Sequence, residues 1–546
     1  MSAVTRLLFD RPASDSTGLW SGADASELTF RTWRRSRETA RALAGGLADA
    51  DVGKGDSVAI LAGEPAEVAA LVQAVWLRGA AFTMLHQPTP RTDLETWVHD
   101  TRAVIEMLDA GIVAVGAPFT DAVRGVDLGT PVVSVEELAA SSNETVPAAT
   151  EEDDIAILQL TSGTTGTPKA VAITYRNLWH NQQAMLSAVA FEPEDVVVSW
   201  LPLYHDMGMI GMLIAPMLAG ITTVNVTPLA FLKNPVSWAE LVTRFGATVT
   251  AAPDFAYSIL TRRLRRAPES AYDLSSLRVA IDGAEALDAA TLHEFAEAAA
   301  RFGFHPEALM PAYGMAETTL AVSFTAVDDR YSTDAFDTDL AERDGIIVRE
   351  PAARTRTLVK LGRTVPGIEA TVVDENGDPL PADRIGTIMV RGDAVTRHYL
   401  GPTGYVLALD AAGRLDTGDL GYLTATGEIV VTGRKKDVII VSGRNISPVA
   451  VERAAATVAG VRPGAVAAIG VRLPGATRES IAVIAESDAS GNADTCERIR
   501  KEVARAIYDD IGVTPAVVTV VDKGALPKTP SGKLRRSSAA DLIPTP

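Results

Sequence analysis

Apolar residues in the first part of the chain recur at two different spacings. Across residues 32–49, Trp33, Ala40, Leu43 and Leu47 fall on one helical face, which predicts a helix. Residues 57–61 (SVAIL) predict a buried strand, and residues 65–78 predict a second helix. Strands that alternate with helices indicate a largely parallel α/β sheet. The same pattern predicts further buried strands at residues 132–135, 155–160, 196–200, 248–252 and 278–281.

The longest uncharged stretch has the length of a membrane span. Residues 207–232 contain no Asp, Glu, Lys or Arg. A spanning helix needs about 20 mostly apolar residues in one continuous helix, whereas residues 221–226 (ITTVNV) are β-like. We therefore predict a buried helix followed by a buried strand, and no integral membrane segment. The interruptions are Gly208, Gly211, Pro216, Gly220 and Pro228.

The pattern changes near residue 359, where short strands separated by turns begin. The sequence ENGD at residues 375–378 is typical of a hairpin turn. A smaller α/β unit follows VTGRKKDVIIVSGRN at residues 431–445. We therefore predict a large domain over residues 1–433, a small domain over residues 434–546 and a hinge at Lys436.

The composition indicates a globular protein with more than one hydrophobic core. A chain of 546 residues is too long for one core, and 47% apolar with 22% charged residues is ordinary for a globular protein. The net charge of −19 argues against a nucleic-acid partner. Cys496 is the only cysteine, so no internal disulfide can form. Together with an N-terminus that lacks a signal-peptide core, this favours a cytoplasmic location.

Two loops carry the first chemical signal. Residues 161–169 read TSGTTGTPK, and residues 527–533 read PKTPSGK. Backbone N–H groups and hydroxyls in such a glycine-rich loop can hold phosphate oxygens. The first loop is too short for a Walker loop and leads into an apolar, β-like segment. Taken alone, a loop of this kind is as often a solvated turn.

Five further motifs, in this order, give the chain a family resemblance. They are SWLPLYHDMGMIG (199–211), DGAEAL (282–287), PAYGMAETTLAV (311–322), LDTGDLGYL (415–423) and TGRKKD (432–437). The set resembles the adenylate-forming superfamily of acyl-CoA synthetases, adenylation domains and luciferases over nearly the whole chain. The resemblance implies an α/β fold: a large N-terminal domain of stacked α/β subdomains with a small β-barrel-like subdomain, and a small mobile α+β C-terminal domain.

The resemblance also implies roles for particular residues around ATP. Glu317 would bind Mg²⁺, a hard cation that prefers carboxylate oxygen, with Thr165 assisting; a helix-terminal carboxylate is the alternative. Asp419 would accept hydrogen bonds from the ribose hydroxyls, although it could be a turn residue, and Arg434 would approach the ribose or a phosphate. The phosphates would be held by Thr161, Ser162, Gly163, Thr164, Thr165, Gly166 and Lys169, and the adenine by Gly283, Ala284, Glu285, Tyr313, Gly314, Met315 and Ala316.

Catalysis is expected from Lys533, Glu317 and His205. A cation from Lys533 would stabilise the transition state in which a carboxylate displaces pyrophosphate from ATP; an exposed tail lysine is the alternative. His205 would lie between the acyl pocket and the reacting carboxylate, or it is a buried core histidine. The family then rotates its small domain about a hinge, which Lys436 matches, and a thiol attacks the acyl-AMP.

Within the superfamily, the chain resembles the fatty acyl-AMP ligases. Three motifs support this resemblance: residues 302–322, WLPLYHDMGMIG and SGRNISP (442–448). The chain also has extra sequence at about residues 328–360. The fatty acyl-AMP ligases have an insertion at this place, thought to limit domain movement and CoA use. A tolerated surface loop is the alternative reading of the insertion. Departures are Ala170 after the loop lysine, Thr364-Val365-Pro366 in the later turn and HQPTP at residues 86–90.

The expected activity is conversion of a fatty acid and ATP to acyl-AMP, followed by transfer to the phosphopantetheine of an acyl carrier protein. The rivals are an acyl-CoA synthetase, with CoA as acceptor, and an inactive nucleotide-binding protein. Met is a flexible residue suited to lining an alkyl-chain pocket, although a Met stripe is more often plain core. The acyl-pocket candidates are Trp200, His205, Met207, Met209, Ile210 and Met212. Basic residues could meet an acidic carrier helix or form a solvated face; they are Lys435, Arg444, Arg453, Arg500, Lys501, Arg535 and Arg536.

Overall fold

The computed structural model describes all of the chain except residues 89–91, 162–167, 442, 473–478, 529–533 and 544–546. The chain divides into two compact units. The first comprises residues 1–331, 361–369 and 391–415. The second comprises residues 332–360, 370–390 and 416–546.

The first unit contains an eight-stranded sheet in the order β21-β20-β8-β7-β4-β3-β5-β6. The five strands from β7 to β6 run parallel, and β8, β20 and β21 pair antiparallel at one side. The apolar runs at residues 57–61 and 155–160 therefore form buried parallel strands, as runs of this kind should, whereas the strand predicted as buried at residues 132–135 is only half-buried. The bounds are β3 Ser57–Leu61, β4 Ala81–Met84, β5 Ala110–Val115, β6 Val132–Ser134, β7 Ile155–Leu160, β8 Ala170–Thr174, β20 His398–Gly401 and β21 Gly404–Leu407.

The first unit also contains a nine-stranded sheet in the order β17-β14-β13-β12-β11-β9-β10-β1-β2. Its central strands are parallel, and antiparallel pairs join β1 to β2, β13 to β14 and β14 to β17. The bounds are β1 Gly18–Gly22, β2 Thr29–Thr32, β9 Val196–Ser199, β10 Thr222–Val226, β11 Val249–Ala252, β12 Val279–Asp282, β13 Leu309–Gly314, β14 Ala321–Phe324 and β17 Arg363–Thr364.

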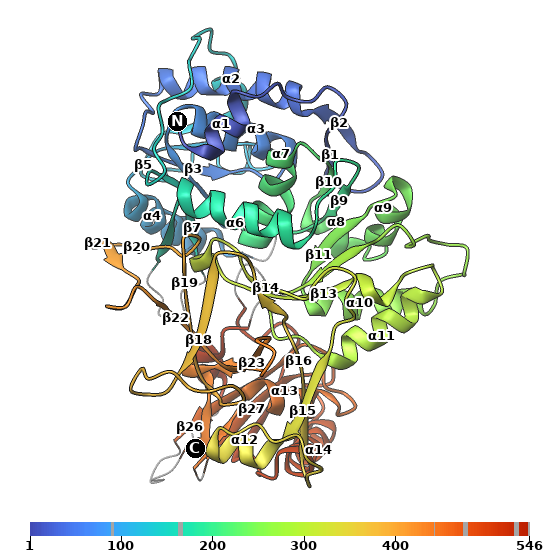
Figure 1. Ribbon diagram of the computed structural model, residues 1–546. Helices are drawn as coiled ribbons and strands as arrows, with labels where there is room; N and C mark the ends of the chain where they lie inside the picture. Colours follow the sequence, from blue (N-terminus) through green and yellow to red (C-terminus); the bar gives the residue numbers. More distant parts are fainter. Residues whose placement is uncertain (89–91, 162–167, 442, 473–478, 529–533, 544–546) are drawn as a thin grey trace. The chain divides into compact units, whose positions relative to one another are not determined.

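Helices cover these sheets (Figure 1). The predicted helix at residues 32–49 is α2, where Thr32 accepts a hydrogen bond from the Arg35 backbone as the N-cap. Helix α3 is buried along almost its whole length, as a helix that is apolar all round should be. The bounds are α1 Ala3–Phe9, α2 Trp33–Asp49, α3 Pro65–Leu77, α4 Leu94–Leu108, α5 Val135–Ala139, α6 Tyr175–Ala188, α7 Ala215–Ala219, α8 Pro228–Lys233, α9 Ser237–Phe245, α10 Asp254–Leu264 and α11 Ala289–Ala300.

The uncharged stretch at residues 207–232 forms the predicted helix and strand. A π-helix, η1 (Met207–Ile214), continues into α7, and Gly220 in the left-handed region ends that helix before β10. None of the helices in the described residues has the length and apolar character that a membrane crossing requires. The sequence did not predict the π-helical geometry, because the apolar pattern indicates a helix but not its hydrogen-bond spacing.

The second unit begins with a hairpin of β15 (Thr333–Asp337) and β16 (Thr355–Val359), with α12 (Thr338–Asp344) between the two strands. A four-stranded sheet, β18-β19-β22-β23, forms in the region predicted to hold a small β subdomain. Its ENGD turn is confirmed, since the Asp374 N–H donates to the Asp378 carbonyl and Gly377 has φ +87°. The sheet bounds are β18 Ile368–Val373, β19 Gly386–Gly392, β22 Leu415–Leu423 and β23 Ile429–Arg434.

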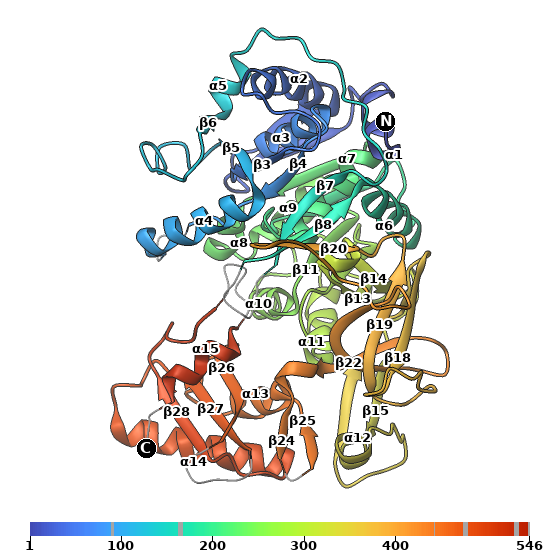
Figure 2. The ribbon, with the colours of Figure 1, turned by 90° about the vertical axis from the view of Figure 1, so that its left-hand side faces the viewer.

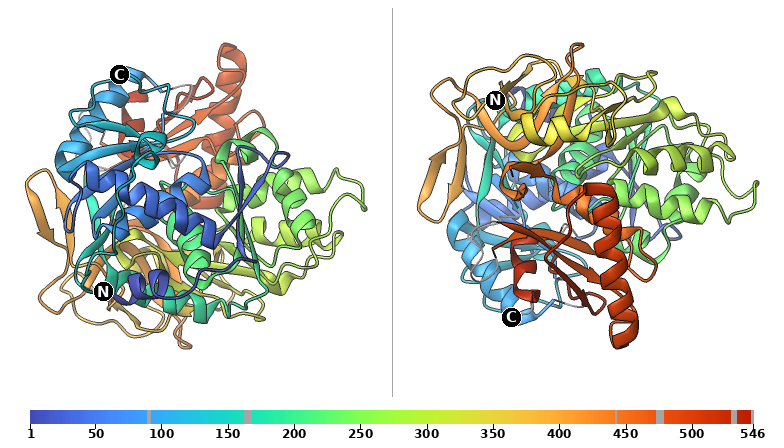
Figure 3. Two further views of the ribbon diagram at one scale, coloured as in Figure 1. Left: turned by 90° about the horizontal axis from the view of Figure 1, so that it is seen from above. Right: turned by 90° about the horizontal axis from the view of Figure 1, so that it is seen from below.

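The C-terminal residues of the second unit build a separate small α+β layer (Figure 2). Helices α13 and α14 pack on one face of the sheet β26-β27-β28, and α15 packs on the other. Figure 3 shows the length of α14 beside the strands in its right-hand view. The bounds are β24 Ile439–Val441, β25 Arg444–Ile446, α13 Pro448–Ala456, β26 Val466–Val471, β27 Ser480–Glu486, α14 Ala493–Ile511, β28 Val517–Val521 and α15 Arg536–Ala539.

Candidate functional site

The two predicted adenine-binding segments leave the same edge of the nine-stranded sheet. Strands β12 and β13 are parallel neighbours, with Asp282 opposite Pro311. The segment Gly283, Ala284 and Glu285 follows β12 directly, and Tyr313 and Gly314 end β13 before Met315 and Ala316. Ligands of open α/β sheets bind outside the carboxyl ends of the strands. The fold therefore brings the two segments together at an edge suited to a ligand.

Local backbone geometry explains the small residues in these segments. A Cβ on Gly314 would lie 2.1 Å from the Leu320 carbonyl oxygen, so only glycine fits there. Ala284 has φ +69°, a left-handed conformation that is uncommon for alanine. The Glu285 carboxylate accepts a hydrogen bond of 2.8 Å from the Phe255 N–H in the first turn of α10. Glu285 thus holds the start of this helix, besides its predicted role beside the nucleotide.

Asp282, which immediately precedes this edge, is fully buried. Burial raises its carboxyl pKa well above the ordinary value, and the neighbouring charges of Asp254 and Glu285 raise the pKa further. Burial and the neighbouring negative charges therefore both favour the protonated form of Asp282, beside the predicted adenine segment.

The glycine-rich loop connects β7 to β8, and its two ends are close. The Thr161 N–H donates to the Lys169 carbonyl over 3.3 Å, and the following residue, Ala170, pairs with Leu160. The Lys169 ammonium nitrogen lies 3.8 Å from the centre of the Tyr399 ring. Ser162, Gly163, Thr164, Thr165 and Gly166 lie outside the described residues.

Glu317 is half-buried in the short helix η3 (Ala316–Thr318). Its carboxylate accepts a hydrogen bond of 2.9 Å from the Tyr399 hydroxyl. No group of three or more metal-ligating side chains occurs within the described ranges. One carboxylate still fits Mg²⁺, which proteins commonly bind through one or two carboxylates together with substrate phosphates. The sequence motifs do not predict the contact with Tyr399, because this residue is 82 positions from Glu317 and lies outside every motif.

His205 is fixed by the residue that follows it. Its Nδ1 lies 2.6 Å from an Asp206 carboxylate oxygen, and the two side chains are 19% and 13% exposed. The same oxygen accepts a hydrogen bond from the Met207 N–H at the start of η1. This pairing sets the imidazole orientation through Nδ1. The role of His205 at the acyl carboxylate stays a prediction.

The other acyl-pocket candidates are all buried. Trp200 stacks on Phe231 with ring centres 3.9 Å apart, and Trp200, Met207, Met209, Ile210 and Met212 are each less than 9% exposed. Four of these residues lie in η1, and π-helical turns occur frequently at functional sites.

In the second unit, Asp419 and Arg434 are cross-strand partners on β22 and β23. Arg434 Nε lies 2.7 Å from the buried Asp419 carboxylate, while half of the Arg434 side chain is exposed. The ion pair is formed without a ligand, and its role at the ribose stays a prediction. Lys436 lies in the short helix η4 (Lys435–Asp437) that follows β23. Lys533 lies outside the described residues.

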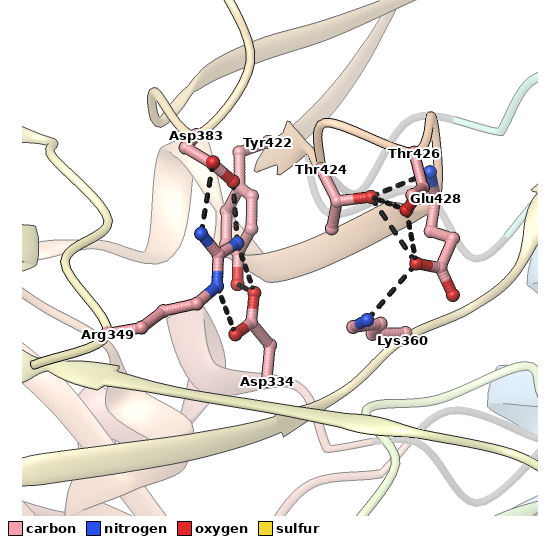
Figure 4. Close-up of polar contacts among 8 residues, drawn as sticks. All are labelled: Asp334, Arg349, Lys360, Asp383, Tyr422, Thr424, Thr426 and Glu428. Atoms are coloured by element: carbon pink, nitrogen blue, oxygen red, sulfur yellow. Dashed lines mark hydrogen bonds and ion pairs between the residues drawn. The ribbon is translucent and has the colours of Figure 1, made fainter.

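Residues of the predicted insertion are bonded to the four-stranded sheet (Figure 4). Arg349 forms two hydrogen bonds to each of the Asp334 and Asp383 carboxylates, at 2.6–3.0 Å. Although burial alone would raise the Asp334 pKa, hydrogen bonds from Arg349 and Tyr422 hold it below the ordinary value. Further along, Lys360 lies 3.1 Å from Glu428. The insertion is therefore an integral part of the second unit.

The insertion also contacts the C-terminal residues of its unit. Glu342 on α12, only 5% exposed, pairs with Arg444 on β25 at 2.5 Å. Arg354, which lies 3.7 Å from Glu342, donates to the Asp510 carbonyl near the end of α14. Burial lowers the pKa of the adjacent Arg356 to about 10, and its guanidinium donates to the Thr432 carbonyl. Glu342 therefore has its charge partners within its own unit.

The basic residues that could meet a carrier helix are largely occupied by carboxylates. Arg444 is held by Glu342, and Arg536 lies 2.7 Å from Glu452 and 3.1 Å from Asp437. Arg500 and Lys501 both face Glu497 on their own helix. The structure therefore does not favour these residues as a free basic patch.

The sequence from residue 15 to residue 400 matches the family model described as AMP-binding enzyme. The chain belongs to the AMP-binding enzyme family. Members of this adenylate-forming superfamily activate an acid with ATP, and the chain is an acid-activating ligase of this kind. The confirmed α/β fold, with its smaller C-terminal part, agrees with this assignment.

The chain is also similar to two named proteins and to one solved structure along most of its length. A Mycobacterium tuberculosis protein named "Putative ligase Rv1013" is 46% identical over 100% of both chains. Another from the same species, "Putative fatty-acid--CoA ligase fadD25", is 32% identical over 75% of this chain and 74% of its own. A structure from a study of fatty acyl-adenylate ligases of E. coli and L. pneumophila is 29% identical, with TM-score 0.89, over 99% and 97% of the two chains.

Proposed function

We propose that this AMP-binding enzyme is a fatty acyl-AMP ligase. It joins a fatty acid to ATP, releasing pyrophosphate, and then passes the acyl group from acyl-AMP to the phosphopantetheine thiol of an acyl carrier protein in the cytoplasm. The fatty-acid substrate is supported by the likeness to fatty acyl-adenylate ligases over 99% of the chain. The observation that carries the choice of acceptor is the insertion joined to the C-terminal residues through Glu342, Arg444 and Arg354.

These contacts bear on the acceptor because they oppose rotation. If residues 434–546 turn about Lys436 after adenylation, the Glu342–Arg444 pair and the Arg354–Asp510 hydrogen bond must break. A buried charge left without its partner costs about 3–5 kcal/mol, so Glu342 would need water or a new partner after the rotation. A ligand can shift a conformational equilibrium only by its difference in affinity for the two states. A carrier protein can favour the rotated state through the contacts of a whole docking surface, whereas free CoA has no such surface.

The first step would use residues whose roles follow from the family resemblance. In the first unit, Thr161, Lys169 and the loop between them would hold the phosphates, residues 283–285 and 313–316 would hold the adenine, and His205 would lie at the acyl carboxylate. In the second unit, Asp419 and Arg434 would hold the ribose, and Lys533 would approach the carboxylate and the α-phosphate. Glu317, assisted by Thr165, would hold Mg²⁺, which when bound neutralises charge on the phosphate oxygens.

An acyl-CoA synthetase is the second candidate, and one specific observation favours it: a relative covering 75% of this chain has a name that includes fatty-acid–CoA ligase. Both candidates share the first half-reaction. An inactive nucleotide-binding protein differs from both, because it would catalyse no pyrophosphate exchange.

The test is the product formed from ATP, Mg²⁺ and a panel of fatty acids of different chain length, identified by mass spectrometry. We expect acyl-AMP from at least one fatty acid, together with fatty-acid-dependent exchange of labelled pyrophosphate into ATP. Exchange driven by another class of acid would reject the fatty-acid assignment, and no exchange with any acid would reject the activity.

A further inference from the structure

Tyr399 contacts two of the candidate ATP-binding residues at once. Its hydroxyl donates a hydrogen bond of 2.9 Å to Oε1 of Glu317, and its ring faces the Lys169 ammonium, 3.8 Å from the ring centre. All three residues belong to the first compact unit. No role for Tyr399 follows from the motifs that predicted Glu317 and Lys169.

Backbone pairing fixes Tyr399 in this position. Strand β20 pairs antiparallel with β8, and Tyr399 is opposite Val171, two residues after Lys169. The segment before β20 is also tied to η3, since the Thr396 N–H donates to the Glu317 carbonyl over 2.8 Å. One short strand therefore sets the distance between the lysine that ends the glycine-rich loop and the glutamate of η3.

We infer that Tyr399 is a positioning residue that prepares Glu317 for Mg²⁺ and Lys169 for the terminal phosphates of ATP. This inference rests on the proposed function, which gives Glu317 and Lys169 those roles. Tyr399 itself need not touch either ligand.

The two contacts suit these tasks in different ways. A hydrogen bond to one carboxylate oxygen restricts the Glu317 side chain and leaves the second oxygen for a cation, so less side-chain entropy is lost on binding. The aromatic face holds an ammonium without neutralising its charge. Among the described residues no carboxylate pairs with Lys169, so a phosphate would meet an uncompensated positive charge.

The first test is Tyr399→Phe, which removes the hydroxyl and keeps the ring. ATP affinity is measured by calorimetry in EDTA and across a Mg²⁺ titration, without acid substrate, so that no turnover is needed. The Mg²⁺ concentration that gives half of the affinity gain should rise about tenfold, the size of effect expected for a hydrogen bond to a charged group. Affinity for ATP in EDTA should stay within about twofold, because the contact with Lys169 remains.

The second test is Tyr399→Leu, which removes the ring as well. ATP affinity in EDTA should fall about fivefold as Lys169 loses its support, while AMP affinity stays constant because AMP lacks the terminal phosphates. Tyr405→Phe and Tyr405→Leu are matched controls, since Tyr405 lies on the adjacent strand β21 and is 54% exposed. Circular dichroism and thermal unfolding check that each variant is folded.

The outcomes separate this inference from the proposed function. If the wild-type protein binds MgATP, an unchanged Mg²⁺ requirement in a folded Tyr399→Phe variant overturns the inference. Equal losses of ATP and AMP affinity in Tyr399→Leu also overturn it, because they indicate a general structural role. If the wild-type protein binds no ATP, the proposed function fails and the inference fails with it.

Discussion

Charged side chains are held in two different ways at two places in the molecule. In the first unit, Lys169 rests on an aromatic ring and Glu317 receives one hydrogen bond from a hydroxyl. In the second unit, Arg349 is held by two carboxylates, and the buried Glu342 is held by Arg444. Neutral partners orient Lys169 and Glu317 and leave their charges uncompensated, whereas Arg349 and Glu342 are compensated by partners of opposite charge.

This difference distinguishes binding groups from structural groups. A charge that is oriented by neutral partners keeps its capacity for a ligand, so its substitution should cost activity more than stability. A charge that is paired inside the protein leaves a buried partner unsatisfied when it is removed. Its substitution should cost stability, or change the mobility of the parts that it joins.

The largest effect is expected in the first unit, from Glu317→Gln. The amide keeps the shape but loses the negative charge that Mg²⁺ requires, and adenylation, measured by pyrophosphate exchange, should fall about 100-fold. The melting temperature should change by less than about 2 °C, since one hydrogen bond to Tyr399 is altered. A large loss of stability with normal pyrophosphate exchange would show that Glu317 has a structural role instead of a binding role.

Arg349→Ala in the second unit should show the opposite pattern. It leaves Asp334, whose side chain is 4% exposed, without its arginine, and the loss of unfolding free energy should be about 2 kcal/mol after allowance for the 42% exposure of Arg349. Pyrophosphate exchange per folded molecule should stay normal. The control Arg343→Ala removes an exposed pair with Asp344 and should have little effect on unfolding.

The strands and the site segments differ in how far they could be predicted from the sequence. Strands β3 and β7 have the bounds that their apolar runs predicted, because burial on both faces gives a strong local signal. The pairing of β20 with β8 could not be predicted, because it joins segments far apart in the chain and no local pattern encodes it. Arg444 was considered as a free basic residue for the same reason: its partner Glu342 is 102 residues away.

A third comparison concerns the contact between the insertion and the C-terminal residues. Glu342→Gln keeps the shape of α12 and weakens its ion pairs with Arg444 and Arg354. CoA-dependent thioester formation should rise about tenfold, while pyrophosphate exchange should not change. Asp344→Asn on the same helix is the control, because Asp344 pairs only with exposed Arg343 among the described residues. Unchanged CoA use would leave the insertion without a role in acceptor choice.

The smallest effect is expected from Asp282→Asn, as a change in pH dependence. In the folded protein burial raises the pKa of Asp282 and favours its protonated form, whereas the unfolded chain releases this proton above the ordinary pKa. The folded state then binds more protons, so wild-type stability falls as pH rises from about 4 towards the folded pKa. The Asn variant does not lose stability in this way. Its melting temperature minus that of the wild type should therefore increase by about 1–2 °C for each pH unit between pH 4 and the folded pKa. A constant difference between pH 5 and pH 7 would contradict the buried neutral carboxyl.

The most direct measurement is a competition between acceptors. The wild-type enzyme is incubated with ATP, Mg²⁺, its preferred fatty acid, CoA and a holo acyl carrier protein from the same organism, and the thioester products are quantified by mass spectrometry. We expect acyl-AMP and the acylated form of the carrier protein to account for nearly all of the product, with acyl-CoA as a trace. Rapid and dominant formation of acyl-CoA would contradict the proposed acceptor and identify the protein as an acyl-CoA synthetase.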